Sequence, residues 1–263
     1  MSKGADFPAV QVNGVGMVFN KGATGEVAAL DGIDLTIRAG EFVTLIGPSG
    51  CGKSTLLRLI GDLLTPTAGD VSVFGRSAHE SRTGQDYGMV FQHAGLFDWR
   101  KVKANIELPL ELRGWSRSDR GARSSEMLGL VKLDEFGDHY PRQLSGGMQQ
   151  RVSIARALSF QPRLLLMDEP FGALDEMTRE HMQGELLRIW GETGTTVVFV
   201  THSISEAAFL SNRVIVLSPR PGRVHSIIDV DLGDRTPDTR EDPDFFSAAT
   251  TIREALRSVG GAE

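Results

Sequence analysis

The stretch Gly47-Pro48-Ser49-Gly50-Cys51-Gly52-Lys53-Ser54-Thr55 decides the fold of this chain. It fits the pattern Gly-x-x-x-x-Gly-Lys-Ser/Thr, whose glycines let backbone N–H groups approach phosphate oxygens. The apolar run Phe42–Ile46 before it predicts a buried strand, and Ser54–Ile60 after it predicts a helix, whose N-terminal end attracts anions. Strand, glycine loop and helix in this order indicate a nucleotide site, in which Lys53 reaches the β- and γ-phosphates and Ser54 binds Mg²⁺.

The whole chain has the composition of an ordinary globular protein, with 40% hydrophobic and 24% charged residues among 263. Its formal net charge of −6 argues against nucleic acid as the main partner, because duplex-binding proteins usually present a basic surface. One cysteine excludes an internal disulfide framework. Residues 1–6 lack the apolar centre of a signal peptide, and no apolar run reaches the roughly 20 residues that span a bilayer. At a membrane, we therefore expect the protein to dock on a partner that spans it.

Apolar runs and helical stretches alternate along the rest of the chain and predict an α/β fold. Short strands around 10–12 and 35–37 open the chain, and residues of about 97–160 are mostly helical in pattern. Helices expected at about 176–191 and 204–211 alternate with the later strands, which predicts a mainly parallel sheet covered on both faces. A polar stretch from about Asp234 closes with a short helix expected around Ile252–Val259.

Three of the predicted strands end in polar side chains that suit ATP hydrolysis. After Leu164–Met167 we expect Asp168 to hold Mg²⁺ and Glu169 to orient and polarise the attacking water. His202 is placed to contact the γ-phosphate or that water, and Gln92 to touch Mg²⁺ or water through its carbonyl oxygen. Each of these residues alone is equally compatible with a surface or hydrogen-bonded loop position. Their common sheet edge favours the catalytic interpretation.

A second glycine-opened helix is expected to begin at Ser145. This serine is a good N-cap, but capping does not explain Gly146 and Gly147. Two consecutive glycines cost helix stability and expose backbone N–H groups to an anion. A second phosphate-binding helix start in a chain with one phosphate loop predicts a nucleotide that two chains share.

These segments together resemble the ATP-binding subunit of ABC transporters over residues of about 10–230. The resemblance implies a P-loop NTPase of ABC type, with a mainly parallel sheet core, an antiparallel β region and an inserted helical subdomain. It implies a nucleotide-binding domain over residues 1–235, a helical subdomain at about 95–160 and a polar C-terminal tail over 236–263, with ATP and Mg²⁺ as cofactors. The matching motifs are Walker A at Gly47–Thr55, the Q-loop at Gln92, the signature at Leu144–Arg151, Walker B at Leu164–Glu169, the D-loop at Ala173–Asp175 and the switch histidine at His202.

Two further segments resemble the nitrate/sulfonate/taurine import group: Leu217–Arg223 and Leu96–Val102. This implies a subunit at the cytoplasmic face of the membrane that hydrolyses ATP to drive import of a small solute through a separate permease. A solute-binding protein is an indirect partner. The resemblance also implies a head-to-tail homodimer, in which the signature of one chain closes on the γ-phosphate held by the other. Leu96–Asn105 is the expected permease contact, with Trp99 either its exposed anchor or packed within the helical subdomain.

Some positions depart from the family pattern. Met148 stands where the signature commonly has glutamine, and Gln149 is expected to compensate in part. The aromatic residue that stacks on adenine is usually tyrosine; Phe19 is its expected counterpart, with a core strand position as the alternative. Cys51 is expected to be a reactive thiol that nucleotide protects. The nucleotide-binding set from the partner's side comprises Ser145, Gly146, Gly147, Gln149 and Asp175.

Two other classes of function compete with transport. A non-transport ABC ATPase acting on nucleic acid or ribosomes usually has two nucleotide domains or a very long insertion, and neither occurs here. A P-loop kinase would leave the signature helix and His202 unexplained. The sequence therefore favours the transporter subunit and leaves the identity of the solute open.

Overall fold

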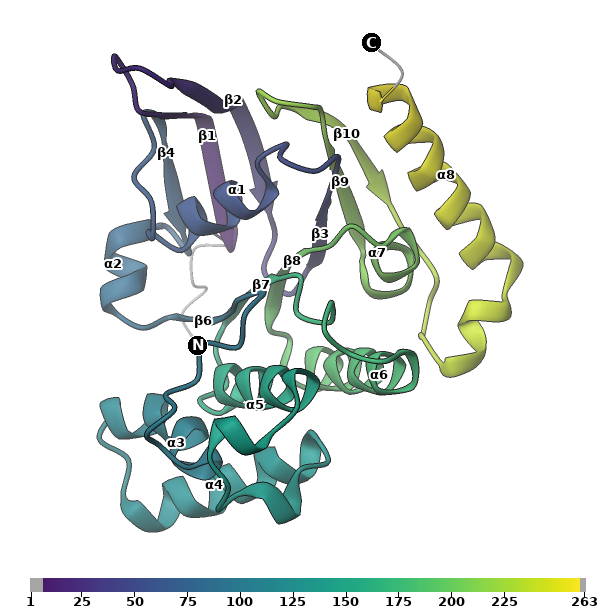
Figure 1. The fold of residues 1–263 in the computed structure, drawn as a ribbon. Coiled ribbons are helices and arrows are strands. Elements are labelled where there is room, and N and C mark those ends of the chain that lie inside the picture. The colour runs from purple at the N-terminus through teal and green to yellow at the C-terminus, as the bar shows by residue number, and fades with distance from the viewer. Residues whose placement is uncertain (1–6, 261–263) are drawn as a thin grey trace, which may run out of the picture.

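The computed structural model describes residues 7–260 and contains two sheets with helices around them (Figure 1). The ends of the predicted nucleotide-binding domain and C-terminal tail, residues 1–6 and 261–263, lie outside the described residues. One sheet has four strands in the order β2-β1-β4-β5, and the other has six in the order β10-β9-β3-β8-β7-β6. The strands are β1 Val10–Phe19, β2 Val27–Ile37, β3 Phe42–Ile46, β4 Ala68–Val73, β5 Arg76–Ser77, β6 Tyr87–Val90, β7 Leu164–Asp168, β8 Thr196–Val200, β9 Arg213–Leu217 and β10 Val224–Asp229.

Most helices lie on the side of the six-stranded sheet that faces away from the four-stranded one (Figure 1). Helix α1 lies between the two sheets. The helices are α1 Lys53–Ile60, α2 Ala78–Thr83, α3 Val102–Leu112, α4 Arg117–Leu130, α5 Gly146–Leu158, α6 Glu176–Thr193, α7 Ile204–Leu210 and α8 Pro243–Gly260, with short 3₁₀ turns η1 Asp134–Phe136, η2 Pro141–Gln143 and η3 Pro237–Glu241. No helix within the described part of the chain is long and apolar enough to cross a membrane.

The six-stranded sheet is parallel except for β10, which runs antiparallel to β9. Its strands β3, β7 and β8 are buried along their whole length, as strands between two layers must be, whereas every second residue of β10 is exposed. In β3, for example, Phe42 and Ile46 lie on the side of α6 and α7, whereas Val43 and Leu45 share a core with α1 and the four-stranded sheet. The predicted α/β fold, with a parallel core and an antiparallel region, is confirmed.

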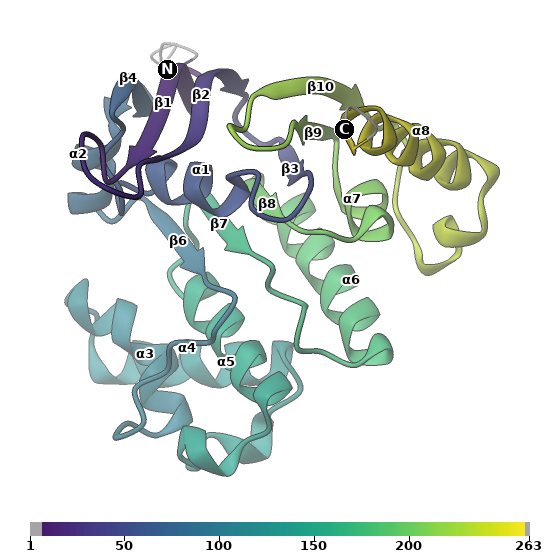
Figure 2. The same ribbon diagram turned by 45° about the horizontal axis from the view of Figure 1, so that its top comes forward.

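Helices α3, α4 and α5 lie together, away from the four-stranded sheet, in both views (Figures 1 and 2). Val102, Ile106 and Met127 are buried between them. The start of α5 therefore lies on a different part of the molecule from α1, which follows β3. The two glycine-opened helix starts, those of α1 and α5, are therefore not adjacent within one chain.

The C-terminal helix is longer than the sequence analysis predicted. It covers Pro243–Gly260 rather than Ile252–Val259, and it packs on α7, β9 and β10. Phe245, Ala249, Ile252 and Val259 are buried at helical spacing and belong to the same core as the sheet. The helix begins earlier than expected because the polar residues between these positions, which the sequence analysis assigned to the tail, occupy its exposed face.

The first two strands are also longer than predicted. The strand expected at 10–12 continues to Phe19, and the one expected at 35–37 begins at Val27. Their pairing shifts register between Val12 and Val18. These irregularities break the alternation of apolar and polar residues by which a strand is recognised in sequence.

Candidate active site

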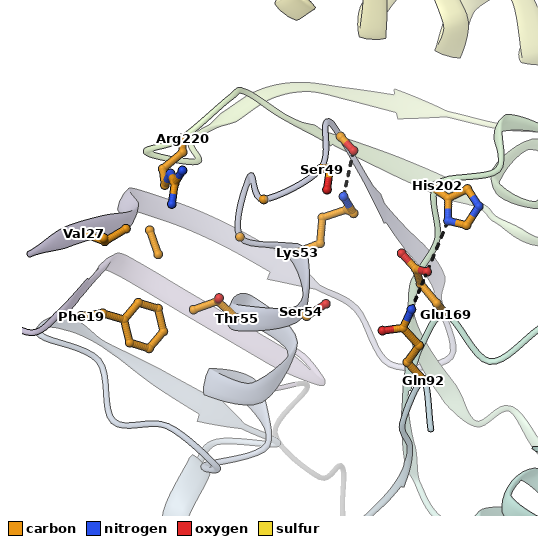
Figure 3. A pocket seen from close by; sticks show the side chains of 14 residues that line it. Phe19, Val27, Ser49, Lys53, Ser54, Thr55, Gln92, Glu169, His202 and Arg220 are labelled. Atoms are coloured by element: carbon orange, nitrogen blue, oxygen red, sulfur yellow. Dashed lines mark hydrogen bonds and ion pairs between the residues drawn. The ribbon is translucent and has the colours of Figure 1, made fainter. Parts of the chain in front are cut away.

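A cavity of about 590 Å³ opens at the edge of the six-stranded sheet where its parallel strands end (Figure 3). Because β3, β6, β7 and β8 all point toward this edge, the residues that follow them meet there. Its lining combines most of the glycine loop with strand-end side chains and a few residues of β1, β2 and the β9–β10 turn: Phe19, Val27, Ala29, Gly47, Ser49, Gly50, Gly52, Lys53, Ser54, Thr55, Gln92, Glu169, His202 and Arg220.

The glycine loop leaves the first turn of α1 without a side-chain cap. Gly52 precedes the helix with a φ of 102°, a conformation that favours glycine, and no side chain accepts a hydrogen bond from the first N–H groups. At Gly47 a Cβ atom would lie 2.8 Å from the carbonyl oxygen of Leu217. The loop is thus packed tightly against β9 from behind, and its front presents uncapped N–H groups to an anion.

Lys53 is buried at the base of the loop. Its ammonium donates to the carbonyl oxygens of Gly47, at 2.8 Å, and Pro48, at 3.0 Å. A buried ammonium with no carboxylate partner is costly unless polar groups surround it, and the loop carbonyls do so here. The ammonium of Lys53 is therefore held at the cavity wall, where it can donate hydrogen bonds to a phosphate instead.

Ser54 and Asp168 offer oxygen atoms side by side. The Ser54 hydroxyl donates to Oδ1 of Asp168 at 2.7 Å. Burial raises the pKa of Asp168, and the Ser54 hydrogen bond opposes that shift. Hydroxyl and carboxylate oxygens are the ligands that Mg²⁺ prefers, so this pair fits the cation.

Three predicted catalytic residues meet at the Glu169 carboxylate (Figure 3). Nε2 of Gln92 donates to Oε2 of Glu169 at 3.4 Å, and Nδ1 of His202 lies 3.3 Å from the same oxygen. Glu169 has a φ of 47°, and its N–H donates to the carbonyl oxygen of Val200 at 3.0 Å. The end of β7 is therefore tied to β8, and the carboxylate is turned toward both partners.

Two residues of the glycine loop do not line the cavity, namely Pro48 and Cys51. The Cys51 thiol is fully buried, and its sulfur lies where a Cβ on Gly47 would be 2.8 Å away. The expectation of a reactive thiol is wrong because this side chain points into the core. Its backbone is held inside the loop, where its N–H donates to the carbonyl oxygen of Pro48 at 3.3 Å.

The second glycine-opened helix does not contribute to this cavity. Ser145 caps α5 by accepting from the N–H of Met148 at 3.3 Å. A Cβ atom on Gly146 would meet nothing within 4 Å, so the backbone there faces open space. The Gln149 amide donates to the carbonyl oxygens of Pro141, at 3.0 Å, and Leu144, at 3.3 Å, which ties it to its own chain.

Asp175 also lies outside the cavity and caps α6. It accepts a hydrogen bond from the N–H of Thr178 at 3.0 Å, and hydrogen bonding to Thr178 lowers the pKa of this carboxyl. This contact alone accounts for an aspartate at the helix start. Within one chain, the cavity therefore brings together most of the glycine loop with Gln92, Glu169 and His202. Its lining leaves out Pro48, Cys51, Asp168, Ser145, Gly146, Gly147, Gln149 and Asp175, although Asp168 contacts Ser54 at its edge.

The sequence analysis missed Arg220, which lines the cavity from the β9–β10 turn. It lies at the same end of the cavity as Phe19 and Val27, opposite His202 (Figure 3). The turn is fixed on β2, because the N–H of Gly222 donates to the Ala29 carbonyl oxygen at 2.9 Å. No local pattern could have shown this, since β2 and the turn are far apart in sequence.

Two residues of α5 hold the segment after β6 and were missed as well. Gln150 donates to the carbonyl oxygen of Phe91 at 2.9 Å, beside Gln92. Arg156 donates to the carbonyl oxygens of Ala94, at 2.9 Å, and Gly95, at 2.8 Å, and burial lowers its pKa. Gln150 and Arg156 are six residues apart, about 120° around α5, so their spacing gave no sign of a common neighbour.

Comparison with known proteins identifies the family. The ABC transporter family model matches residues 30–172. The chain is 46% identical to the nitrate import ATP-binding protein NrtD of Synechocystis sp., covering 90% of this chain and 91% of that one. It is 47% identical to the taurine import ATP-binding protein TauB of Rhizobium johnstonii, covering 89% and 90%.

A solved structure agrees with these relatives. A dimeric ATP-binding cassette in a post-hydrolysis state, bound to ADP and phosphate, superposes with a TM-score of 0.78 at 36% identity, covering 84% of this chain and 99% of that one. The fold is therefore the P-loop NTPase fold of ABC type. The chain belongs to the ABC transporter family, as an ATP-binding subunit that hydrolyses ATP.

Proposed function

We propose that this protein energises the import of a small solute of the nitrate, sulfonate or taurine type through a separate membrane permease. The observation that supports it most is the meeting of Gln92 and His202 on the Glu169 carboxylate at one end of the cavity. Relatives named for nitrate and taurine import support the solute class. They do not favour the alternative of an ATPase acting on nucleic acid or ribosomes.

We infer that ATP lies along the cavity with its phosphates on the glycine loop. Phe19 and Arg220 then lie at the base end and Glu169 at the γ-phosphate end (Figure 3). Phe19 is half-buried and lines the cavity, so a face of its ring is available for adenine to stack on. Arg220 adds a positive charge on the same wall.

The chain's own groups divide the work of hydrolysis. Lys53 and the N–H groups of the first turn of α1 bind the phosphates. Glu169 orients the water and accepts its proton, and Gln92 and His202 hold the carboxylate in place. Ser54, Asp168 and Gln92 would hold Mg²⁺, which when bound neutralises charge on the β- and γ-phosphates.

A second copy of the chain would supply the signature residues Ser145–Gly147, which do not line the cavity of their own chain. Gly146 faces open space on α5, and the solved cassette that resembles this chain is dimeric. A head-to-tail homodimer would bring Ser145–Gly147 of one chain to the γ-phosphate bound by the other. Asp175 would then lie close to that junction, at the start of α6.

The permease contact is proposed at Leu96–Asn105. Trp99 is 74% exposed, and its ring lies 4.9 Å from that of Phe97, so it does not pack into the helical part. Asn105 is fully buried and accepts from the Phe97 N–H at 2.8 Å, which holds the loop from inside. Exposed aromatic side chains of this kind commonly anchor interfaces.

We further infer that the subunit lies peripherally at the cytoplasmic face of the membrane, with a solute-binding protein as an indirect partner. Within it, residues 1–235 would form the nucleotide-binding domain, with a helical subdomain at about 95–160. Residues 236–263 would form a C-terminal segment, which α8 attaches to the domain over its described part.

Recovery of the tagged protein from detergent-solubilised native membranes tests this proposal. We expect a multi-span permease to copurify, and Trp99→Ala to reduce its recovery by about tenfold, because interface tryptophans are often worth more than 1 kcal/mol. Trp115→Ala is the matched control, since Trp115 is 41% exposed outside the proposed contact. Recovery of ribosomes or nucleic acid instead of a permease would contradict the proposed function.

A further inference from the structure

A buried carboxylate lies behind His202 and is not used by the proposed chemistry. Glu206 of α7 is 8% exposed and accepts hydrogen bonds from the Thr201 hydroxyl and, at 3.4 Å, from the Gln183 amide. Nε of Arg179 lies 3.8 Å from its Oε1. Burial raises the pKa of Glu206, and the Thr201 hydrogen bond and the Arg179 charge oppose this. A buried acid with this many donors has a defined place in the fold.

Glu206 holds the backbone on both sides of His202. The Thr201 hydroxyl donates to Glu206 and accepts from the N–H of Ser203 at 3.0 Å. The Ser203 hydroxyl in turn accepts from the N–H of Glu206 at 3.3 Å. The side chain of His202 is 72% exposed, so its position depends on this backbone rather than on packing.

The same carboxylate is connected to the C-terminal segment. Gln183 of α6 is 3% exposed, and while its amide nitrogen donates to Glu206, its oxygen accepts from the Arg240 guanidinium. Arg240 belongs to η3, and its guanidinium lies 3.5 Å from the centre of the Phe209 ring and 3.4 Å from Glu180. Hydrogen bonds thus run from Arg240 through Gln183, Glu206 and Thr201 to the two neighbours of His202.

We propose that Glu206 is a positioning residue for His202, and that Gln183 and Arg240 make the C-terminal segment part of its support. The inference rests on the proposed role of His202 in hydrolysis. None of these four supporting side chains, Thr201 included, lines the nucleotide cavity. Their loss should therefore slow turnover and leave ATP binding unchanged.

The test measures ATP affinity and turnover on the full chain. We expect Glu206→Gln, which keeps the shape and removes the charge, to lower kcat about tenfold with the ATP Kd within about twofold. Gln183→Ala and Arg240→Ala should lower kcat by about threefold, because each acts through one more contact. Arg253→Ala, on the exposed face of α8, is the control and should change neither value.

A cycle with His202 separates positioning from a general structural role. In a His202→Ala background, single-turnover hydrolysis should show no further loss when Glu206→Gln is added. A further tenfold loss, or an unchanged kcat in a folded Glu206→Gln protein, would overturn the inference. If Glu206→Gln does not fold, Arg240→Ala decides in its place by the same cycle. Absence of hydrolysis in the unaltered chain would instead overturn the proposed function, and this inference with it.

Discussion

Two helices of this protein begin at glycine-rich sequences, and the structure uses their first turns differently. Helix α1 starts after Gly52 with no side-chain cap and opens into a cavity that its own chain lines. Helix α5 starts after Ser145, which caps it, and Gly146 faces open space. The sequence predicts an anion-binding start for both helices. Among the described residues of one chain, a cavity surrounds only the start of α1.

In the proposed homodimer, this difference would divide one site between two copies of the chain. The start of α1 with the glycine loop and the strand ends around it, here called the α1 half, holds Lys53 and the Ser54–Asp168 pair in place, so we expect nucleotide to bind to a single chain. The start of α5 with Gly146 and Gly147, here called the α5 half, lies on the helical part away from α1 (Figure 2), and in the proposed homodimer it would face the nucleotide of the second chain. Binding should therefore depend on the first half and turnover on both.

Glu169→Gln should give the largest effect, because it removes the proton acceptor and leaves the α1 half intact. We expect turnover to fall by about 10² to 10⁴, the usual contribution of general base catalysis, with ATP binding preserved. ATP that is bound but not cleaved should accumulate a dimer, measurable by sedimentation at saturating ATP. A variant that stays monomeric there would contradict the division between two chains.

Lys53→Ala removes the charge from the α1 half itself. We expect ATP affinity to fall by about 2 to 3 kcal/mol, or roughly 30- to 150-fold, since hydrogen bonds to charged groups are worth this much. Isothermal titration measures the affinity, and thermal unfolding without nucleotide shows whether the carbonyls of Gly47 and Pro48 tolerate the loss. Unchanged affinity in a folded protein would remove Lys53 from the site.

Gly146→Ala tests the α5 half alone, because a Cβ atom there meets nothing within the chain. We expect ATP affinity to stay the same and kcat to fall about tenfold, since the methyl group would stand between α5 and the partner's phosphate. Gly191→Ala in α6 is the matched control: it also meets nothing, and should add about 0.5–1 kcal/mol of stability without changing kcat. Unaltered kcat in Gly146→Ala would mean that α5 does not approach a phosphate.

Most of the α1 half could be predicted from sequence because its parts are local. A strand, a glycine loop and a helix follow one another at 42–60, and parallel strands must end at one edge, which places Glu169 and His202 beside the loop. The direction of a side chain within a tight loop is not local. Cys51 lies within the glycine loop, where the sequence analysis expected an accessible thiol, yet its side chain is turned inward beside Gly47 and β9.

What sequence could not show depends on contacts between distant segments. Arg220 reaches the cavity only because Gly222 pairs with β2. Glu206 resembles an ordinary first-turn acid of α7 until α6 covers it with Gln183. The extent of α8, by contrast, was readable locally, because its buried residues Phe245, Ala249, Ile252 and Val259 recur at helical spacing.

Phe19→Ala should give the smallest effect and tests the base end of the α1 half. Stacking of a base on an aromatic ring is worth about 1–3 kcal/mol, and the low end is expected for a half-buried ring, so ATP affinity should fall about fivefold. Phe19→Tyr should keep the affinity, because either ring offers a face, whereas Phe19→Leu fills the strand position without one. If Phe19→Leu binds ATP as the unaltered chain does while Phe19→Ala loses thermal stability, Phe19 is a core residue and the base is held by other groups of the wall. If both lose affinity equally at unchanged stability, the ring itself completes the α1 half, and a single chain then binds the whole nucleotide without help from α5.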